Sequence, residues 1–133
     1  MKRIKEVSKL SGLSRRTLQY YDEQKLLQVT RSAENYRLYR DEDLQTLWKI
    51  LLYKEMGFRL DKIRSLLSMD DRQAQNILQE HLAGMKAEIR ELNKKCQLIG
   101  MIKESGIPDP DIASNEQNTK TYRERIRELF KNL

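Results

Sequence analysis

Apolar residues recur at helical spacing at the start of the chain. From Ile4 to Leu10 every third residue is apolar, and Gly12 then permits the backbone conformation that ends a helix. Ser14 can cap a second helix over residues 15–22 by accepting a hydrogen bond from an amide of its first turn. The pattern therefore predicts two short helices joined by a tight turn.

The following segment alternates in the manner of a β-hairpin. Two stretches, at 28–31 and 36–39, flank Asn35, which tolerates the positive φ of a turn better than most residues do. One face of this hairpin, or wing, can pack against the domain while the other meets a partner. The alternation places Tyr36 and Leu38 on one face and Arg37 and Tyr39 on the other.

Two more helices are predicted after the wing. Acidic residues 41–43 suit a helix N-terminus, and apolar residues follow at helical spacing up to Gly57. We expect Asp61 to cap a fourth, shorter helix, whose apolar face comprises Ile63, Leu66 and Leu67.

The longest periodic pattern covers residues 70–104. Its apolar positions alternate at spacings of four and three and form a narrow heptad stripe: Leu78, Leu82, Met85, Ile89, Leu92, Cys96 and Ile99. Such a helix would be about 50 Å long, so it would overhang a small domain, and we expect a second subunit to supply the partner helix. The alternative is a helix folded back on its own chain, although no later helix is long enough to cover the stripe.

A break follows the long helix, because glycine and proline at Gly106, Pro108 and Pro110 interrupt it. Residues 121–133 then carry apolar side chains on one helical face and basic side chains opposite. We therefore expect a mainly α chain in three parts. These are a winged helix-turn-helix domain over 1–69, a coiled-coil helix over 70–104, and a loop with a short amphipathic helix over 105–133.

The composition limits the class of protein. The 133 residues are 38% apolar and 35% charged with a mean hydropathy of −0.80, and no apolar run approaches the roughly 18 residues of a membrane span. The N-terminus lacks the apolar stretch of a secretory signal, and the single Cys96 cannot form an internal disulfide. We expect a cytoplasmic protein that does not associate with membranes.

Basic residues are unevenly distributed along the chain. Residues 1–69 hold 15 Lys and Arg against 9 Asp and Glu, whereas residues 70–133 hold 11 of each kind. The whole net charge of +6 therefore belongs to the N-terminal half, which suits a defined contact with nucleic acid. A solvated basic face without a partner is the alternative.

The second helix of a helix-turn-helix enters the major groove of DNA. The candidate contacts on it here are Ser14, Arg15, Arg16, Thr17, Gln19 and Tyr20. Arginine can bond guanine or phosphate, glutamine can pair with adenine, and hydroxyl groups can bond phosphate. Because the adjacent Tyr20 and Tyr21 point about 100° apart, we expect Tyr20 to face DNA and Tyr21 to pack. An exposed basic turn is the alternative role of the two arginines.

Spaced motifs in residues 1–69 resemble the MerR family of bacterial transcription regulators. They occur in the family's order: Ile4-Lys5-Glu6-Val7, Gly12-Leu13-Ser14, Arg16-Thr17-Leu18, Tyr20-Tyr21-Asp22, Leu26-Leu27, Tyr36-Arg37-Leu38-Tyr39, Asp43-Leu44 and Gly57-Phe58. The resemblance implies a homodimer, joined by an antiparallel coiled coil, that binds a pseudo-palindromic operator in promoter DNA. It also implies that the dimer bends and untwists an overlong promoter spacer so that RNA polymerase engages both promoter elements.

The resemblance also implies DNA contacts at three places. They are the recognition helix with Arg16, Thr17 and Tyr20, a first wing with Tyr36, Arg37 and Tyr39, and a second wing with Lys54, Phe58 and Arg59. Three positions depart from the family's pattern, since Asn35 and Lys25 stand where glycine is usual and Gln19 where arginine is common. We expect Asn35 to preserve the turn and Gln19 to alter base or phosphate contacts.

Neither cofactor chemistry nor catalysis is indicated. Residues 105–114 contain neither Cys nor His, so we expect no thiolate metal site of the kind found in metal-sensing relatives. Cys96 lies on the heptad stripe, which favours an apolar role, and His81 beside it is expected at the surface or interface. We predict a regulator, not an enzyme, without a large effector domain and with no effector that the residues identify. The alternatives are an architectural DNA-binding protein that senses nothing and a protein-interaction module.

Overall fold

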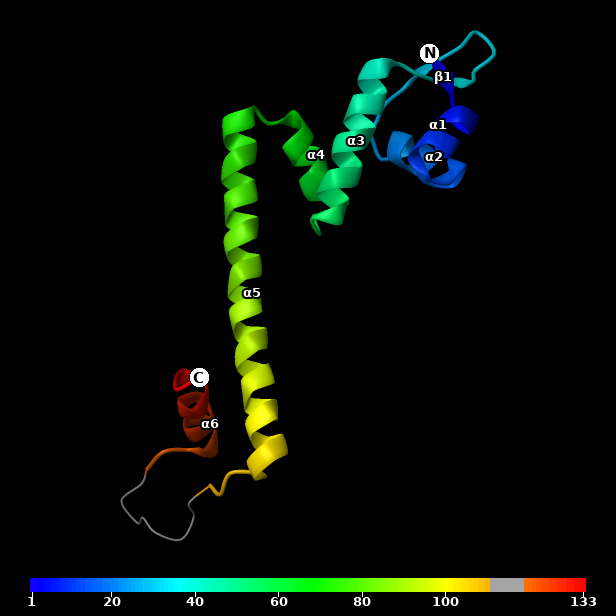
Figure 1. Cartoon of the computed structure of the whole chain (residues 1–133). Helices are drawn as coiled ribbons and strands as arrows, with labels where there is room; N and C mark the ends of the chain where they lie inside the picture. Colours follow the sequence, from blue (N-terminus) through cyan, green and yellow to red (C-terminus); the bar gives the residue numbers. More distant parts are fainter. Residues whose placement is uncertain (111–118) are drawn as a thin grey trace. The chain divides into compact units, whose positions relative to one another are not determined.

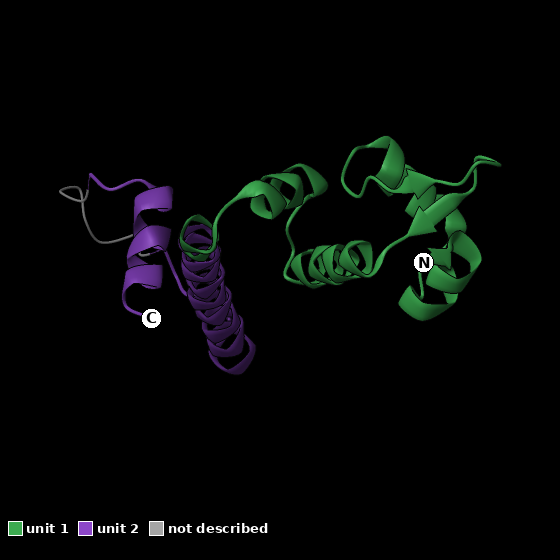
Figure 2. Ribbon diagram, turned by 90° about the horizontal axis from the view of Figure 1, so that it is seen from above, with its two compact units in different colours: residues 1–75 green, residues 76–133 purple. Residues whose placement is uncertain are grey.

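The computed structural model describes residues 1–110 and 119–133 (Figure 1). Its elements follow in the order β1 (Lys2–Arg3), α1 (Ile4–Ser11), α2 (Arg15–Glu23), β2 (Thr30–Arg31), β3 (Arg37–Tyr39), α3 (Asp41–Glu55), α4 (Leu60–Ser68), α5 (Asp71–Ser105) and α6 (Tyr122–Lys131). They form two compact units, Met1–Gln75 and Asn76–Leu133, coloured separately in Figure 2. The predicted mainly α fold with a small antiparallel wing is confirmed. Part of the predicted loop, residues 111–118, lies outside the described residues.

The two predicted N-terminal helices and their turn are confirmed as α1 and α2. Gly12 adopts a left-handed conformation with φ of 76°, and its amide donates to the carbonyl of Ser8 over 3.0 Å. The Ser14 hydroxyl accepts a hydrogen bond from the amide of Thr17 over 3.0 Å and so caps α2. The turn therefore begins and ends at the residues whose chemistry predicts it.

A three-stranded antiparallel sheet forms the wing, with β3 between β1 and β2. Arg31 pairs with Arg37 across β2 and β3, and Asn35 turns the chain between these strands with φ of 68°. The predicted hairpin is thus confirmed. Strand β1 was not predicted, because two residues are too few to show an alternating pattern; it pairs Arg3 with Leu38.

Helix α4 begins two residues earlier than predicted. Its N-cap is Arg59, and Asp61 lies inside the first turn, so the prediction that Asp61 caps the helix is wrong. Gly57 turns the chain with φ of 94° directly after α3, and the buried Phe58 follows. This tight connection places the start of α4 at Leu60, where Asp61 can still interact favourably with the helix dipole.

Among the described residues, the buried core belongs entirely to the unit Met1–Gln75. It comprises Val7, Leu18, Tyr21, Leu26, Leu27, Tyr39, Leu47, Ile50, Phe58, Ile63 and Leu66. The buried carboxylate of Asp43 accepts hydrogen bonds from the backbone amide of Arg40 over 2.8 Å and from its guanidinium. Every one of the four N-terminal helices contributes to this core, which holds α2 and the wing in place.

The unit Asn76–Leu133 contains most of the 35-residue α5 and the shorter α6, which lies beside the C-terminal turns of α5 (Figure 1). Neither helix has a fully buried residue. Within residues 1–110 and 119–133, no helix is both long enough and apolar enough to span a bilayer. The same residues hold no cluster of His, Cys, Asp or Glu arranged to bind a metal ion.

Candidate nucleic-acid interface

Helix α2 has one buried face and one exposed basic face. Leu18 and Tyr21 lie in the core, whereas Arg15, Arg16 and Tyr20 are exposed. The exposed fraction is 45% for Tyr20 and 2% for Tyr21, so the predicted division between these neighbours is confirmed as far as packing is concerned. Because the buried face fixes the helix, the two arginines and Tyr20 project from a rigid support.

The remaining polar candidates on α2 have roles within the fold. Ser14 and Thr17 share a hydrogen bond of 2.9 Å between their hydroxyl groups, in addition to the cap made by Ser14. Gln19 is half-buried on the flank of the helix. If the hydroxyl group of Ser14 or Thr17 also contacts DNA, that contact is a second role beside its hydrogen bond at the start of α2.

The wing exposes only part of its predicted contact set. Tyr36 is exposed, and the guanidinium of Arg3 lies over its ring at 4.8 Å from the centroid. The ring of Tyr39 is only 1% exposed and belongs to the core, while the side chain of Arg37 is 16% exposed and faces α2. The face that carries Arg37 and Tyr39 is thus the inward one, and the DNA contacts predicted for these two residues stay predictions.

Asp22 connects the wing to α2, and sequence reasoning missed it. Its Oδ2 accepts a hydrogen bond from Nε of Arg37 over 2.8 Å and lies 3.7 Å from Nη2 of Arg31. These two arginines are directly opposed across β2 and β3, where like charges repel. The carboxylate of Asp22 relieves that repulsion, and a pair of opposed arginines in a predicted hairpin was the signal that an acidic partner exists nearby.

The connection between α3 and α4 forms a second projection. Lys54 and Arg59 are exposed, but the ring of Phe58 is buried and meets Tyr53 edge-to-face, with 6.0 Å between ring centroids. Phe58 therefore anchors this connection with its ring in the core, and its predicted DNA contact stays a prediction. The two cations that flank it remain available.

Two pKa shifts reflect the packing around the wing. Burial raises the pKa of the Tyr39 phenol, and a hydrogen bond to Asp43 raises the pKa of Arg40. The Tyr39 hydroxyl is buried and has no hydrogen-bond partner among the described residues. Arg40 thus stays charged, and Tyr39 stays neutral, over the range in which proteins normally work.

Most of the heptad stripe is exposed in the single chain. Leu78 is half-buried, and the other six members are exposed, from 44% at Leu82 to 65% at Ile99 among the large apolar side chains. His81, beside the stripe, is half-buried. A long apolar stripe exposed on one face of a helix is the surface that a coiled-coil partner would cover.

Known proteins share this arrangement. Residues 2–70 match the sequence model of the MerR HTH family of regulatory proteins. The HTH-type transcriptional activator mta of Bacillus subtilis is 30% identical over 139 aligned residues, which cover 96% of this chain and 54% of that protein. The chain thus spans about half the length of this relative.

Two solved structures are similar. MtaN, the N-terminus of a Bacillus subtilis multidrug transporter activator, superposes with a TM-score of 0.71 at 34% identity, covering 79% of this chain and all of that one. HiNmlR, a MerR family regulator lacking the sensor domain and bound to promoter DNA, has a TM-score of 0.56 at 25% identity, covering 77% of this chain and 86% of that one. The family match covers more than half of the sequence. The chain is therefore a member of the MerR family of helix-turn-helix regulatory proteins.

Proposed function

We propose that this chain is a dimeric, sequence-specific DNA-binding regulator of transcription. The observation that carries the proposal is the exposed face of α2, where Arg15, Arg16 and Tyr20 project from a helix whose other face is locked in the core. Family membership and the similarity to a promoter-bound regulator support it. The excess of positive charge in residues 1–69 supplies the attraction to phosphate.

The exposed residues divide into base readers and positioning contacts. Arg15, Arg16 and Gln19 lie on the helix that enters the major groove, where arginine and glutamine can bond base edges. Tyr36 on the first wing, with Lys54 and Arg59 at the second projection, suits contacts to the phosphate backbone. Phosphate contacts on both sides of the recognition helix would fix its register on the duplex.

A second copy of the chain completes the DNA-binding unit. The heptad stripe gives each subunit a long apolar surface, and a two-fold dimer presents its two recognition helices to a pseudo-palindromic site. Such a dimer can hold promoter DNA in a bent or untwisted form and thereby change how RNA polymerase meets the promoter elements. RNA polymerase is then the second macromolecular partner at the promoter.

The test begins with the selection of preferred sequences from a random duplex pool by the full chain, followed by anisotropy titrations on the selected site. Arg16→Ala should cost about 1–3 kcal/mol of binding free energy and relax the sequence preference. Arg90→Ala, which removes the same charge from the middle of α5, is the matched control and should change little. Lys54→Ala should weaken binding to all sequences and lower the salt dependence by about one unit.

The outcome that opposes the proposal is equally specific. The proposal fails if the selection enriches no sequence from the random pool. It also fails if the Arg16→Ala and Arg90→Ala variants bind the selected site with equal affinity. Footprinting on the natural promoter then tests the distortion mechanism. Protection between the two promoter elements, with cleavage enhanced at its centre, is expected if the bound DNA is bent.

A further inference from the structure

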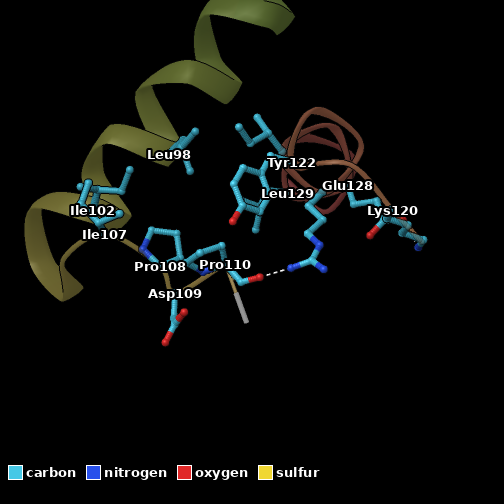
Figure 3. A pocket seen from close by; sticks show the side chains of 12 residues that line it. Leu98, Ile102, Ile107, Pro108, Asp109, Pro110, Lys120, Tyr122, Glu128 and Leu129 are labelled. Carbon is cyan, nitrogen blue, oxygen red and sulfur yellow. Dashed lines mark hydrogen bonds and ion pairs between the residues drawn. The ribbon is translucent and has the colours of Figure 1, made fainter. Parts of the chain in front are cut away.

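A hollow of about 630 Å³ lies between the C-terminal turns of α5 and helix α6 (Figure 3). It belongs wholly to the unit Asn76–Leu133. Its volume falls in the range of about 300–1,000 Å³ that small-molecule sites occupy. Apolar side chains from α5, from the segment after it and from α6 form most of the wall, among them Leu98, Ile102, Pro108, Pro110, Ile126 and Leu129.

One cation in this wall lacks a full set of partners. Nη1 of Arg125 donates a hydrogen bond to the carbonyl of Pro110, drawn as a dashed line in Figure 3, and the guanidinium lies 6.0 Å from the centre of the Tyr122 ring. Its Nε is buried and has no acceptor among the described residues. No ion pair to Arg125 occurs within residues 1–110 and 119–133, whereas Glu128 is paired with Lys120. A buried N–H without an acceptor is unfavourable, so a turn of the Arg125 side chain that brings this N–H to an acceptor on a ligand gains binding energy.

We propose that this hollow binds a small organic anion that has an apolar aromatic body and a single carboxylate. The carboxylate would accept hydrogen bonds from the Arg125 guanidinium, and the aromatic body would lie against Leu98, Ile102 and Ile126. Charge-assisted hydrogen bonds of guanidinium to carboxylate are among the strongest in proteins. A cationic ligand is disfavoured, because both carboxylates in the wall already have partners: Glu128 is engaged by Lys120, and Asp109 is not free either.

A ligand in this hollow would affect how α5 and α6 pack within the unit Asn76–Leu133. Its walls come from both α5 and α6, so a bound molecule would hold α6 against the turns of α5 that carry Leu98 and Ile102. Ile99 of the heptad stripe lies between these two residues in sequence. The site is defined by residues of α5 and α6 alone, so its existence does not depend on DNA binding.

The test is a calorimetric titration of the full chain, without DNA, using three probes of one size and different charge. They are 2-naphthoate, neutral 2-naphthalenemethanol and cationic 2-naphthylmethylammonium. We expect 2-naphthoate to bind about ten- to one-hundred-fold more tightly than the alcohol, and the cation to bind most weakly. Arg125→Gln should abolish the preference for the anion. Arg123→Gln, two residues earlier on the exposed surface of α6, should preserve it.

A second variant keeps the proposal testable if the loss of Arg125 disturbs α6. Ile126→Trp narrows the hollow while leaving every charge in place, and it should lower 2-naphthoate affinity at least tenfold with an unchanged helical circular dichroism signal. Equal affinities for the three probes would overturn the proposal, because adsorption to the exposed heptad stripe gives no preference for an anion. So would identical 2-naphthoate affinities for the Arg125→Gln and Arg123→Gln variants.

Discussion

Nε of Arg37 on strand β3 donates a 2.8 Å hydrogen bond to Oδ2 of Asp22 on helix α2, and both side chains are only 16% exposed. This pair joins the wing to the recognition helix. Arg31 approaches the same oxygen at 3.7 Å from a more exposed position. The Asp22 carboxylate therefore adds a polar link between the wing and α2 to the core that holds both in place.

We predict that Arg37→Gln lowers the free energy of unfolding by about 1–3 kcal/mol, because it leaves the half-buried Asp22 carboxylate with a weaker partner. Asp22→Asn should cost more, because it leaves Arg31 and Arg37 opposed without a neutralising charge. Urea denaturation at fixed protomer concentration measures both.

Arg31→Gln is the control for this pair, because its longer and more exposed ion pair should contribute less than about 1 kcal/mol. In a double-mutant cycle, Arg37→Gln and Asp22→Asn should show a coupling energy of about 1 kcal/mol or more. Additive losses would mean that the two side chains act independently.

Lys25 occupies a left-handed backbone conformation with φ of 58° at the end of α2. That conformation costs an L-residue about 1–2 kcal/mol, and glycine avoids the cost but adds about 0.4–1 kcal/mol of unfolded-state entropy. We therefore predict that Lys25→Gly raises the free energy of unfolding by about 0.5–1 kcal/mol. The contrasting variant is Lys49→Gly inside α3, which should lower it by about 1 kcal/mol. Losses at both positions in thermal melts would contradict the strain argument.

The Tyr39 hydroxyl is buried without a hydrogen-bond partner among the described residues, so Tyr39→Phe should stabilise the protein at neutral pH by about 1 kcal/mol. Burial also raises the pKa of the folded phenol above its ordinary value of 10.0. The unfolded chain then loses this proton first as the pH rises. The part of the free energy of unfolding that depends on the protonated Tyr39 phenol is therefore fully present below pH 10.0 and is lost as the pH rises through the folded pKa.

Unfolding curves between pH 8 and pH 11 check this sign, because the difference between Tyr39→Phe and the unmodified chain should widen as the pH rises. The variant Tyr20→Phe, at an exposed ring, should follow the unmodified chain. A gap that stays constant with pH would mean that the folded and unfolded phenols share one pKa.

Local sequence patterns predict the N-terminal helices and the hairpin, but they do not predict which side chains pack. Capping chemistry at Ser14 and the turn residues Gly12 and Asn35 are local, so the sequence was enough to place α1, α2 and the hairpin. Alternation in β3 showed two faces but could not say which one packs, because that depends on how the sheet lies on the helices. Phe58 and Tyr39 were predicted to contact DNA because they occupy positions that resemble the family's motifs. Whether a ring can reach DNA depends on its burial, which the motifs do not reveal. The Nε of Arg125, buried without an acceptor among the described residues, arises from tertiary packing, so no sequence pattern predicts it.

The heptad stripe leads to the last prediction. Ile89 is 56% exposed in the single chain, so Ile89→Lys should be tolerated by the fold but should place a desolvated charge in the centre of a dimer interface. Ala87→Lys introduces the same residue two positions away on the opposite side of α5 and serves as the control. Light scattering should give twice the chain mass of 15.9 kDa for the unmodified protein and for Ala87→Lys, and 15.9 kDa for Ile89→Lys.

Operator affinity should follow the same order, because two half-sites bound by one dimer reinforce each other whereas a monomer holds only one. The Ile89→Lys variant should therefore bind the selected site much more weakly than Ala87→Lys, although the proposed DNA contacts of α2 are identical in both. An unmodified chain of 15.9 kDa would exclude the dimer. A monomeric Ile89→Lys variant with full operator affinity would instead show that one copy is sufficient for DNA binding, and the stripe would then need a different partner.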